Sequence, residues 1–238
     1  MTNRVAAGLA GLLLLTTACA EQPTPPARES KLSTVLFLGD SIAEGEALPL
    51  TEAFAASGVR FTSIAADGGG NVVGPFSEEN WKKLPEQIAS ATPSVVVYQI
   101  TTYDWGTQRE QQAAYEKLLT TVTDTGAKLV FVTAPPITPD DFYAPHMADL
   151  ERAPEAARAV RSATVLDASA VWGNTYQQKR NGKADRSTDG IHTCPQGAAR
   201  FAAWLLDELA ALFPGFTPAD PKTWANTGWA ADKRFTGC

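Results

Sequence analysis

The stretch LFLGDSIAEG, Leu36–Gly45, joins an apolar run to a polar turn. Residues Thr34–Leu38 are rich in β-forming side chains and predict a buried strand. Residues Ile42–Ser57 are rich in Ala and Glu and predict a helix, which Pro49 is expected to break or restart. Between them, Ser41 is either a turn residue that caps the helix or a nucleophile exposed at a strand end.

The rest of the chain alternates in the same way between short apolar runs and segments with helical spacing. Four further strands are predicted, at Arg60–Ile64, Ser94–Ile100, Lys128–Val132 and Ala163–Asp167. Further helices are predicted at Glu78–Ser90, Gln108–Asp124, Met147–Arg161 and Pro195–Leu212. This order predicts a three-layer α/β/α sandwich with a mostly parallel five-stranded sheet. Loops that follow the strands should converge at the carboxyl edge of that sheet.

The composition fits one globular domain. A chain of 238 residues, with 44% hydrophobic and 19% charged residues, is long enough for a single sizeable α/β domain. The formal net charge of −6 argues against a nucleic-acid partner, because phosphate binding needs clustered Lys and Arg.

The first twenty residues are typical of a bacterial export signal. Arg4 precedes an apolar run, Val5–Leu15, that is too short for a membrane span of roughly 20 residues. The sequence Leu15–Cys19 resembles a lipoprotein signal, which would make Cys19 the lipidated N-terminus, although Thr16 stands where Leu is usual. Cleavage of an ordinary signal at Ala18–Ala20 would instead discard Cys19. We favour the lipoprotein, so the protein is expected outside the cell membrane, lipid-anchored or else secreted.

The predicted boundaries follow from these features. Residues 21–32 form a flexible tether rich in Pro, residues 33–213 the folded domain, and residues 214–238 a tail packed on it. Cys194 and Cys238 are the two cysteines that follow Cys19. Because disulfides persist in an oxidising compartment, we expect these two to form a disulfide bond, and two free thiols are the alternative. We expect the tail to anchor the C-terminus. The alternative is that it also borders the site that includes His192.

The chain has two histidines. His192 follows Asp189 by three residues, so one tight loop can present a carboxylate that orients the imidazole. Such a pair is what a weakly nucleophilic serine such as Ser41 requires. His146 has no motif partner. Two separate histidines without a ligand cluster predict neither a metal site nor a cofactor.

Together, Gly39-Asp40-Ser41 near the start and Asp189–His192 near the end resemble the SGNH/GDSL hydrolase family over residues 34–213. The resemblance implies the flavodoxin-like SGNH hydrolase fold. It also implies that Ser41 is the nucleophile, that His192 is the general base, and that Asp189 orients His192. Asp40 is then expected to brace the loop.

The same resemblance implies an oxyanion hole. Family members use the N–H of the serine, the N–H of a glycine after the second strand, and an asparagine after the third. The glycine is Gly70 by preference, with Gly69 as an alternative. The third block departs from the family pattern, since Thr101-Thr102-Tyr103-Asp104 stands where Gly-x-Asn-Asp is usual and only Asp104 matches. Tyr103 either donates its hydroxyl or helps Trp105 to shape a substrate pocket. Gly70, Tyr103 and Asp104 are therefore the expected oxyanion and substrate-binding residues.

The implied function is that of an exported serine esterase. It would hydrolyse short acyl esters, such as acetyl esters, on cell-envelope glycans or glycolipids. The alternatives are an O-acyltransferase of the same type and a degenerate domain that binds an envelope ligand without turnover. A small acyl ester is the expected partner, and the membrane is contacted only through a lipid on Cys19.

Overall fold

The structure is a computed structural model of the chain, and it describes residues 1–2 and 32–238. The predicted signal sequence from residue 3 on, the lipidation site Cys19 and nearly all of the tether lie outside the described residues. Within the described ranges, no helix combines the length and the apolar character that a membrane crossing requires.

Five strands form one parallel sheet in the order β2-β1-β3-β4-β5. Their bounds are β1 (Thr34–Leu38), β2 (Arg60–Ser63), β3 (Val95–Gln99), β4 (Lys128–Val132) and β5 (Thr164–Leu166). Every residue of β1 and β3 is buried, as expected for central strands that are covered on both faces. The predicted three-layer α/β fold is therefore confirmed.

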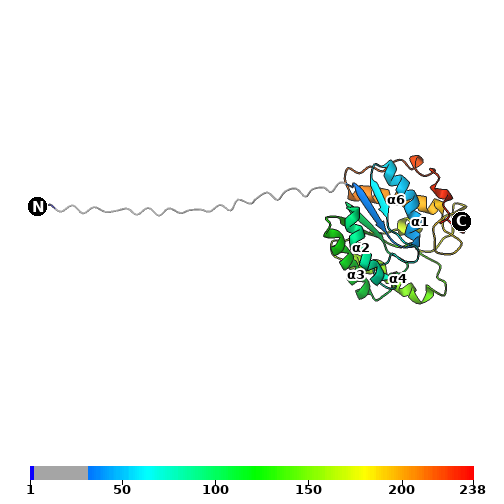
Figure 1. The fold of residues 1–238 in the computed structure, drawn as a ribbon, viewed down its shortest axis with the longest axis horizontal. Helices are drawn as coiled ribbons and strands as arrows, with labels where there is room; N and C mark the ends of the chain where they lie inside the picture. The colour runs from blue at the N-terminus through cyan, green and yellow to red at the C-terminus, as the bar shows by residue number, and fades with distance from the viewer. Residues whose placement is uncertain (3–31) are drawn as a thin grey trace.

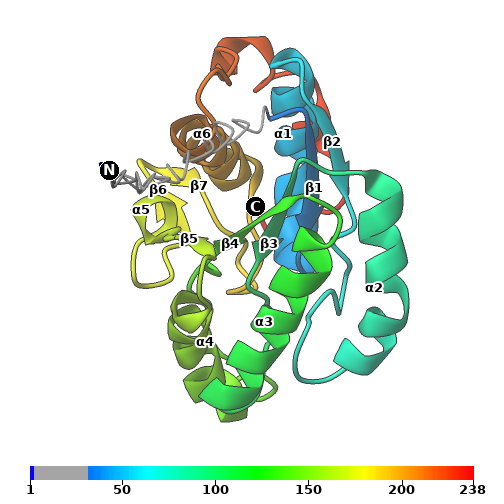
Figure 2. The ribbon, with the colours of Figure 1, turned by 90° about the vertical axis from the view of Figure 1, so that its left-hand side faces the viewer.

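Helices cover both faces of the sheet (Figures 1 and 2). One face carries α1 and α6, and the other carries α2, α3 and α4. Their bounds are α1 (Ser41–Ala56), α2 (Ser77–Ala91), α3 (Gln108–Thr123), α4 (Met147–Ala159) and α6 (Pro195–Leu212). A short helix α5 (Ser169–Trp172) and the hairpin β6 (Lys179–Arg180) and β7 (Lys183–Ala184) precede the last helix.

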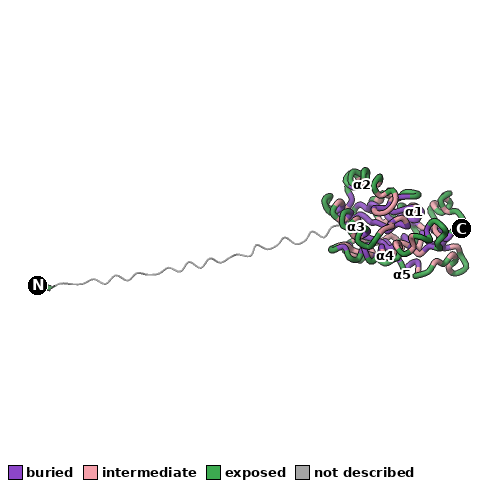
Figure 3. Tube along the Cα trace, turned by 90° about the horizontal axis from the view of Figure 1, so that it is seen from below, coloured by how far each residue is buried: buried purple, intermediate pink, exposed green. Residues whose placement is uncertain are grey.

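Alternate residues of β1 point to opposite sides of the sheet and so belong to two separate cores. Val35 and Phe37 pack toward α1 and α6, whereas Leu36 and Leu38 pack toward the other three helices. The Phe37 ring lies 6.4 Å from the Phe201 ring of α6. Figure 3 shows these buried segments gathered inside the molecule.

One expectation about an element is wrong. Pro49 lies inside α1, which runs unbroken from Ser41 to Ala56. A proline inside a helix costs ~3 kcal/mol because it removes one hydrogen bond and crowds the preceding turn. Pro49 is itself buried, and its neighbour Leu50 is fully enclosed in the core that α1 shares with α6. The packing of this apolar face offsets the local cost.

Candidate active site

Ser41 is the first residue of α1 and follows β1 after a two-residue turn. Its hydroxyl Oγ lies 2.9 Å from His192 Nε2. The preceding residue, Asp40, is the N-cap of α1, and its Oδ1 accepts a hydrogen bond from Ile42 N at 3.0 Å. Because Asp40 performs the capping, the Ser41 side chain is free to interact with His192.

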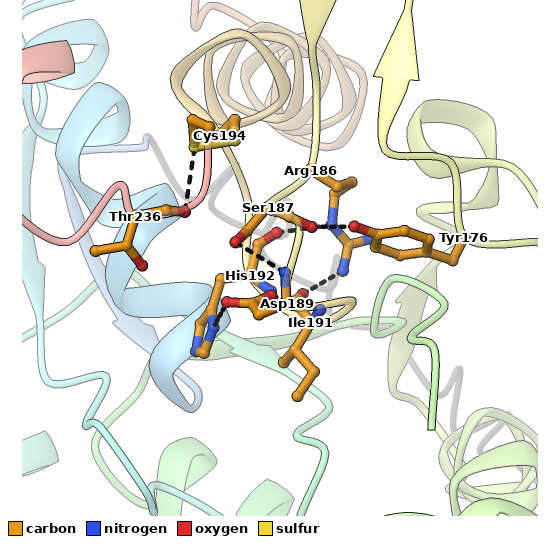
Figure 4. The surroundings of a disulfide bond; sticks show 9 residues. Tyr176, Arg186, Ser187, Asp189, Ile191, His192, Cys194 and Thr236 are labelled. Atoms are coloured by element: carbon orange, nitrogen blue, oxygen red, sulfur yellow. Dashed lines mark hydrogen bonds and ion pairs between the residues drawn. A yellow bond between two sulfur atoms is a disulfide. The ribbon is translucent and has the colours of Figure 1, made fainter. Parts of the chain in front are cut away.

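The loop before α6 places His192 beside Asp189 (Figure 4). His192 Nδ1 lies 2.8 Å from Asp189 Oδ2, while Asp189 Oδ1 accepts from the backbone N–H groups of Ile191 and His192 at 2.8 and 3.0 Å. Partial burial favours the neutral carboxyl, but these hydrogen bonds prevail and lower the pKa of Asp189 to about 2. An ionised Asp189 can only accept, so Nδ1 carries the proton and Nε2 of the neutral ring can accept from Ser41.

Asp40 connects two loops of the site. Its Oδ2 accepts from both the backbone N–H and the hydroxyl of Thr102, at 2.7 and 2.8 Å. Burial raises the pKa of Asp40, although these hydrogen bonds act in the opposite direction. The carboxyl therefore ties the turn before Ser41 to the loop after β3, which is the bracing role expected from the sequence.

The two glycine candidates for the oxyanion hole differ in their surroundings. Gly70 has φ +80°, and a Cβ built there would lie 1.9 Å from the carbonyl oxygen of Gly39. A Cβ at Gly69 would meet nothing within 4 Å. Only glycine fits at position 70, since both the backbone angle and the close approach exclude a side chain. Of the two, Gly70 is the one that packs against the turn before Ser41.

Tyr103 lies among aromatic rings at the end of β3. Its ring centre is 6.1 Å from those of Phe76 and Tyr143 and 5.9 Å from that of Trp105. Burial and the neighbouring Tyr143 hydroxyl raise the pKa of Tyr103 above its ordinary value. The phenol therefore keeps its proton at neutral pH and remains a hydrogen-bond donor.

Asp104 lies beneath this loop and is fully buried. Its carboxylate accepts hydrogen bonds from the hydroxyls of Tyr98 and Tyr115 and from the backbone N–H of Thr101. Burial raises the pKa of Asp104 to about 6, although the hydrogen bonds oppose the shift. Asp104 therefore anchors the loop, and the expectation that it binds the substrate is wrong because its carboxylate has no surface that a substrate could reach.

Arg186, which the sequence did not single out, binds backbone carbonyl groups of the loop that carries His192. Its guanidinium donates to the carbonyl oxygens of His192 at 3.2 Å and Pro136 at 3.0 Å, and also to that of Ile191. It is buried, and its guanidinium carbon lies 5.2 Å from the ring centre of Trp172. Arg186 precedes Asp189 by only three positions, but no motif marks an arginine whose acceptors are backbone carbonyls.

The predicted disulfide between Cys194 and Cys238 is confirmed, with the two Cα atoms 5.7 Å apart. It fastens the tail two residues after His192 (Figure 4). The second histidine, His146, stacks on Trp105 with ring centres 3.5 Å apart and does not contact Ser41 or Asp189. In the part of the chain that the structure describes, no cluster of His, Cys, Asp or Glu is arranged to hold a metal ion.

Comparisons with known proteins agree with the fold. The chain matches the family described as SGNH domain (fused to AT3 domains) over residues 13–205. No curated protein sequence matches.

Several solved structures share the fold. The α/β hydrolase enzyme LAE5, from the metagenome of Lake Arreo, Spain, has 14% identity and a TM-score of 0.57, covering 76% of this chain and 97% of its own. A GDSL-like lipase from Bacteroides thetaiotaomicron has 13% identity and a TM-score of 0.55, with 79% and 92% covered. The acetylxylan esterase Axe2 from Geobacillus stearothermophilus has 14% identity and a TM-score of 0.53, with 77% and 96% covered. With the family match spanning most of its length, the chain belongs to the SGNH domain family.

Proposed function

We propose that this protein is a serine esterase that hydrolyses short acyl esters through Ser41, His192 and Asp189. The observation that supports it best is the continuous hydrogen-bonded series from Ser41 Oγ through His192 to Asp189, at 2.9 and 2.8 Å. A nucleophile, a base and an orienting acid at these distances are what acyl transfer requires.

In the first half of the reaction, Ser41 Oγ attacks the ester carbonyl carbon while its proton moves to His192 Nε2. The carbonyl oxygen becomes an oxyanion, for which the backbone N–H groups of Ser41 and Gly70 are the proposed donors. The Tyr103 hydroxyl is proposed as a third donor in place of the family's asparagine. Collapse of the tetrahedral intermediate breaks the ester C–O bond, and His192 returns its proton to the departing alcohol.

In the second half, water replaces the alcohol. His192 Nε2 takes a proton from the water as its oxygen attacks the acyl carbon of the acyl-Ser41 ester. The proton then passes to Ser41 Oγ as the acid leaves. Asp189 stays ionised throughout and stabilises the imidazolium that forms in each half.

A small ester substrate is supported by the size of the site. The pocket that includes Ser41 and His192 has a volume of about 210 Å³. A larger pocket of about 370 Å³, lined by residues such as Ile137 and Leu150, contains none of the three proposed catalytic residues. The fold neighbour Axe2 is an acetylxylan esterase, which supports acetyl esters on glycans as the substrate class.

The test combines labelling with turnover. Purified protein and a Ser41→Ala control are treated with a fluorophosphonate probe and assayed with p-nitrophenyl acetate and butyrate. We expect labelling and hydrolysis, faster for acetate, that the Ser41→Ala control lacks. Release of p-nitrophenol that accelerates when sugar acceptors are added, with the acylated sugar as product, would instead indicate an acyltransferase. A folded protein with neither labelling nor turnover would be a binding module.

We also propose, from the sequence alone, that the protein is exported and lipid-anchored at Cys19. Expression with labelled palmitate should give a labelled membrane-bound protein, and Cys19→Ser should release it unlabelled. Unlabelled wild-type protein in the culture medium would indicate ordinary secretion.

A further inference from the structure

The C-terminal tail forms part of the pocket that includes Ser41. Tail residues Lys233, Arg234 and Thr236 line this pocket together with Ser41 and His192. The family match ends at residue 205, so this wall of the pocket lies outside the matched residues.

The tail is held firmly at several points. Trp224 is buried in the core that includes α1 and α6. Gly237 accepts a hydrogen bond from Thr188 N at 2.9 Å, next to Asp189, and Cys238 is covalently joined to Cys194. Figure 4 shows Thr236 and the disulfide close to the loop of His192. A segment fixed in this way can contribute binding groups without a large entropic cost.

The charged groups that line the pocket are not all paired. Arg234 binds Asp232 through two contacts of 2.9 Å and approaches Glu44 at 3.5 Å. Among the described residues, Lys233 and Asp67 form no ion pair within 4.0 Å, and both line the pocket. The lining of the pocket thus includes an ammonium group and a carboxylate without an ionic partner, both on exposed residues and both in the pocket that contains Ser41 and His192.

These groups favour one kind of ligand. An apolar acyl chain would remove Lys233 and Asp67 from water without replacing their hydrogen bonds. An anionic group would be attracted by Lys233 and Arg234 but repelled by Asp67 and Glu44, so the two cations and two carboxylates of the lining give it no net attraction. Hydroxyl groups can both accept from an ammonium and donate to a carboxylate, so a neutral polyhydroxylated alcohol satisfies both.

We propose that the tail builds a subsite for the leaving alcohol, in which Lys233 and Asp67 bind hydroxyl groups of a neutral sugar that carries the ester. The inference rests on the proposed esterase function and identifies the part of the pocket that distinguishes one ester from another. The acyl group is then directed away from the tail.

The experiment compares two acetate esters. Values of kcat and KM are measured for 6-O-acetylglucose and for p-nitrophenyl acetate, whose alcohol has no further hydroxyl. For Lys233→Met we expect the ratio of kcat/KM for the sugar ester to that for p-nitrophenyl acetate to fall roughly tenfold, the loss of one hydrogen bond to a charged group. The matched control is Lys222→Met, an exposed tail lysine outside the pocket, for which the ratio should stay within twofold.

A binding measurement separates this inference from the proposed function. Calorimetric titration of 6-O-acetylglucose into Ser41→Ala protein, with and without Lys233→Met, needs no turnover. Roughly tenfold weaker binding in the double variant supports the tail subsite even if the protein hydrolyses nothing. Equal binding in both proteins, or an unchanged ratio of kcat/KM, overturns it.

Discussion

At the scale of single residues, Asp40 and Ser41 have separate roles, one in capping helix α1 and the other in contacting His192. Asp40 caps α1 and fastens the loop after β3, whereas Ser41 directs its hydroxyl at His192. The stretch around Ser41, taken by itself, left open whether this residue was a cap or a nucleophile. The neighbouring carboxylate of Asp40 excludes the capping role, because a helix start needs one side-chain acceptor at its N-cap.

The role of the Tyr103 hydroxyl can be tested by removing it. Tyr103→Phe keeps the ring among its aromatic neighbours but removes the proposed third oxyanion donor. We expect kcat for p-nitrophenyl acetate to fall on the order of 10²-fold with little change in KM, since the donor acts on the transition state. Phe142→Leu, in the same aromatic cluster, is the control for packing. An unchanged kcat in Tyr103→Phe would assign the ring to pocket shape.

The lowered pKa of Asp189 predicts how the unfolding free energy depends on pH. Its pKa in the folded protein, about 2, lies below the ordinary value of 3.8, so its ionised form stabilises the fold at any pH above about 4. That contribution is lost as the pH falls from about 4 toward 2. We expect the difference in unfolding free energy between wild type and Asp189→Asn, measured in urea, to be constant from pH 7 to 5 and to shrink by pH 3. The exposed Asp207→Asn serves as control, and a difference that stays flat to pH 3 would contradict the prediction.

At the scale of elements, the decisive unit is the loop between β7 and α6. It carries Asp189 and His192, and the buried guanidinium of Arg186 holds its carbonyl oxygens. Several donors on one rigid planar group fix a loop better than one flexible ammonium does.

Replacing Arg186 should therefore disturb the positions of Asp189 and His192 more than it weakens substrate binding. For Arg186→Lys we expect kcat to fall at least tenfold with KM changed less than threefold, and the unfolding free energy to fall by about 2–4 kcal/mol, as buried carbonyls lose their donors. Arg200→Lys is a matched control, since Arg200 binds Asp185 and Val171 without touching the carbonyls of Ile191 or His192. A stable Arg186→Lys protein with wild-type kcat would refute the positioning role.

The sequence predicted those features of the fold that depend on neighbouring residues, and missed those that depend on contacts between distant parts of the chain. The runs Thr34–Leu38 and Lys128–Val132 and the helix Pro195–Leu212 were predicted with the observed bounds, because apolar pattern and helix-starting proline act locally. The expectation for Pro49 was wrong because tertiary packing outweighed a local preference. Arg186 and Lys233 could not be foreseen, since their partners are backbone atoms and a pocket that exist only in the folded chain.

At the scale of the whole molecule, the tail and the domain form one unit through the disulfide. Cys194 and Cys238 close a loop with a sequence separation of 44. By loop-closure entropy, Cys238→Ser should lower the unfolding free energy by about 4 kcal/mol, as urea unfolding with and without reductant will measure. The Cys194→Ser/Cys238→Ser double variant should lose a similar amount. Turnover by the folded fraction then shows whether the tail only anchors the C-terminus, which an unchanged kcat and KM would indicate.

The distance along the chain between Ser41 and His192, 151 positions, also has a consequence for the order of folding. Contacts of such separation are slow to form because the entropy of loop closure is lost before they stabilise the fold, so we expect this one to form after the strands have paired. No partly folded chain that lacks the β7–α6 loop can carry the complete triad. Under the proposed function, the appearance of esterase activity during refolding should therefore lag behind the return of secondary structure, so that catalysis reports the final step of assembly.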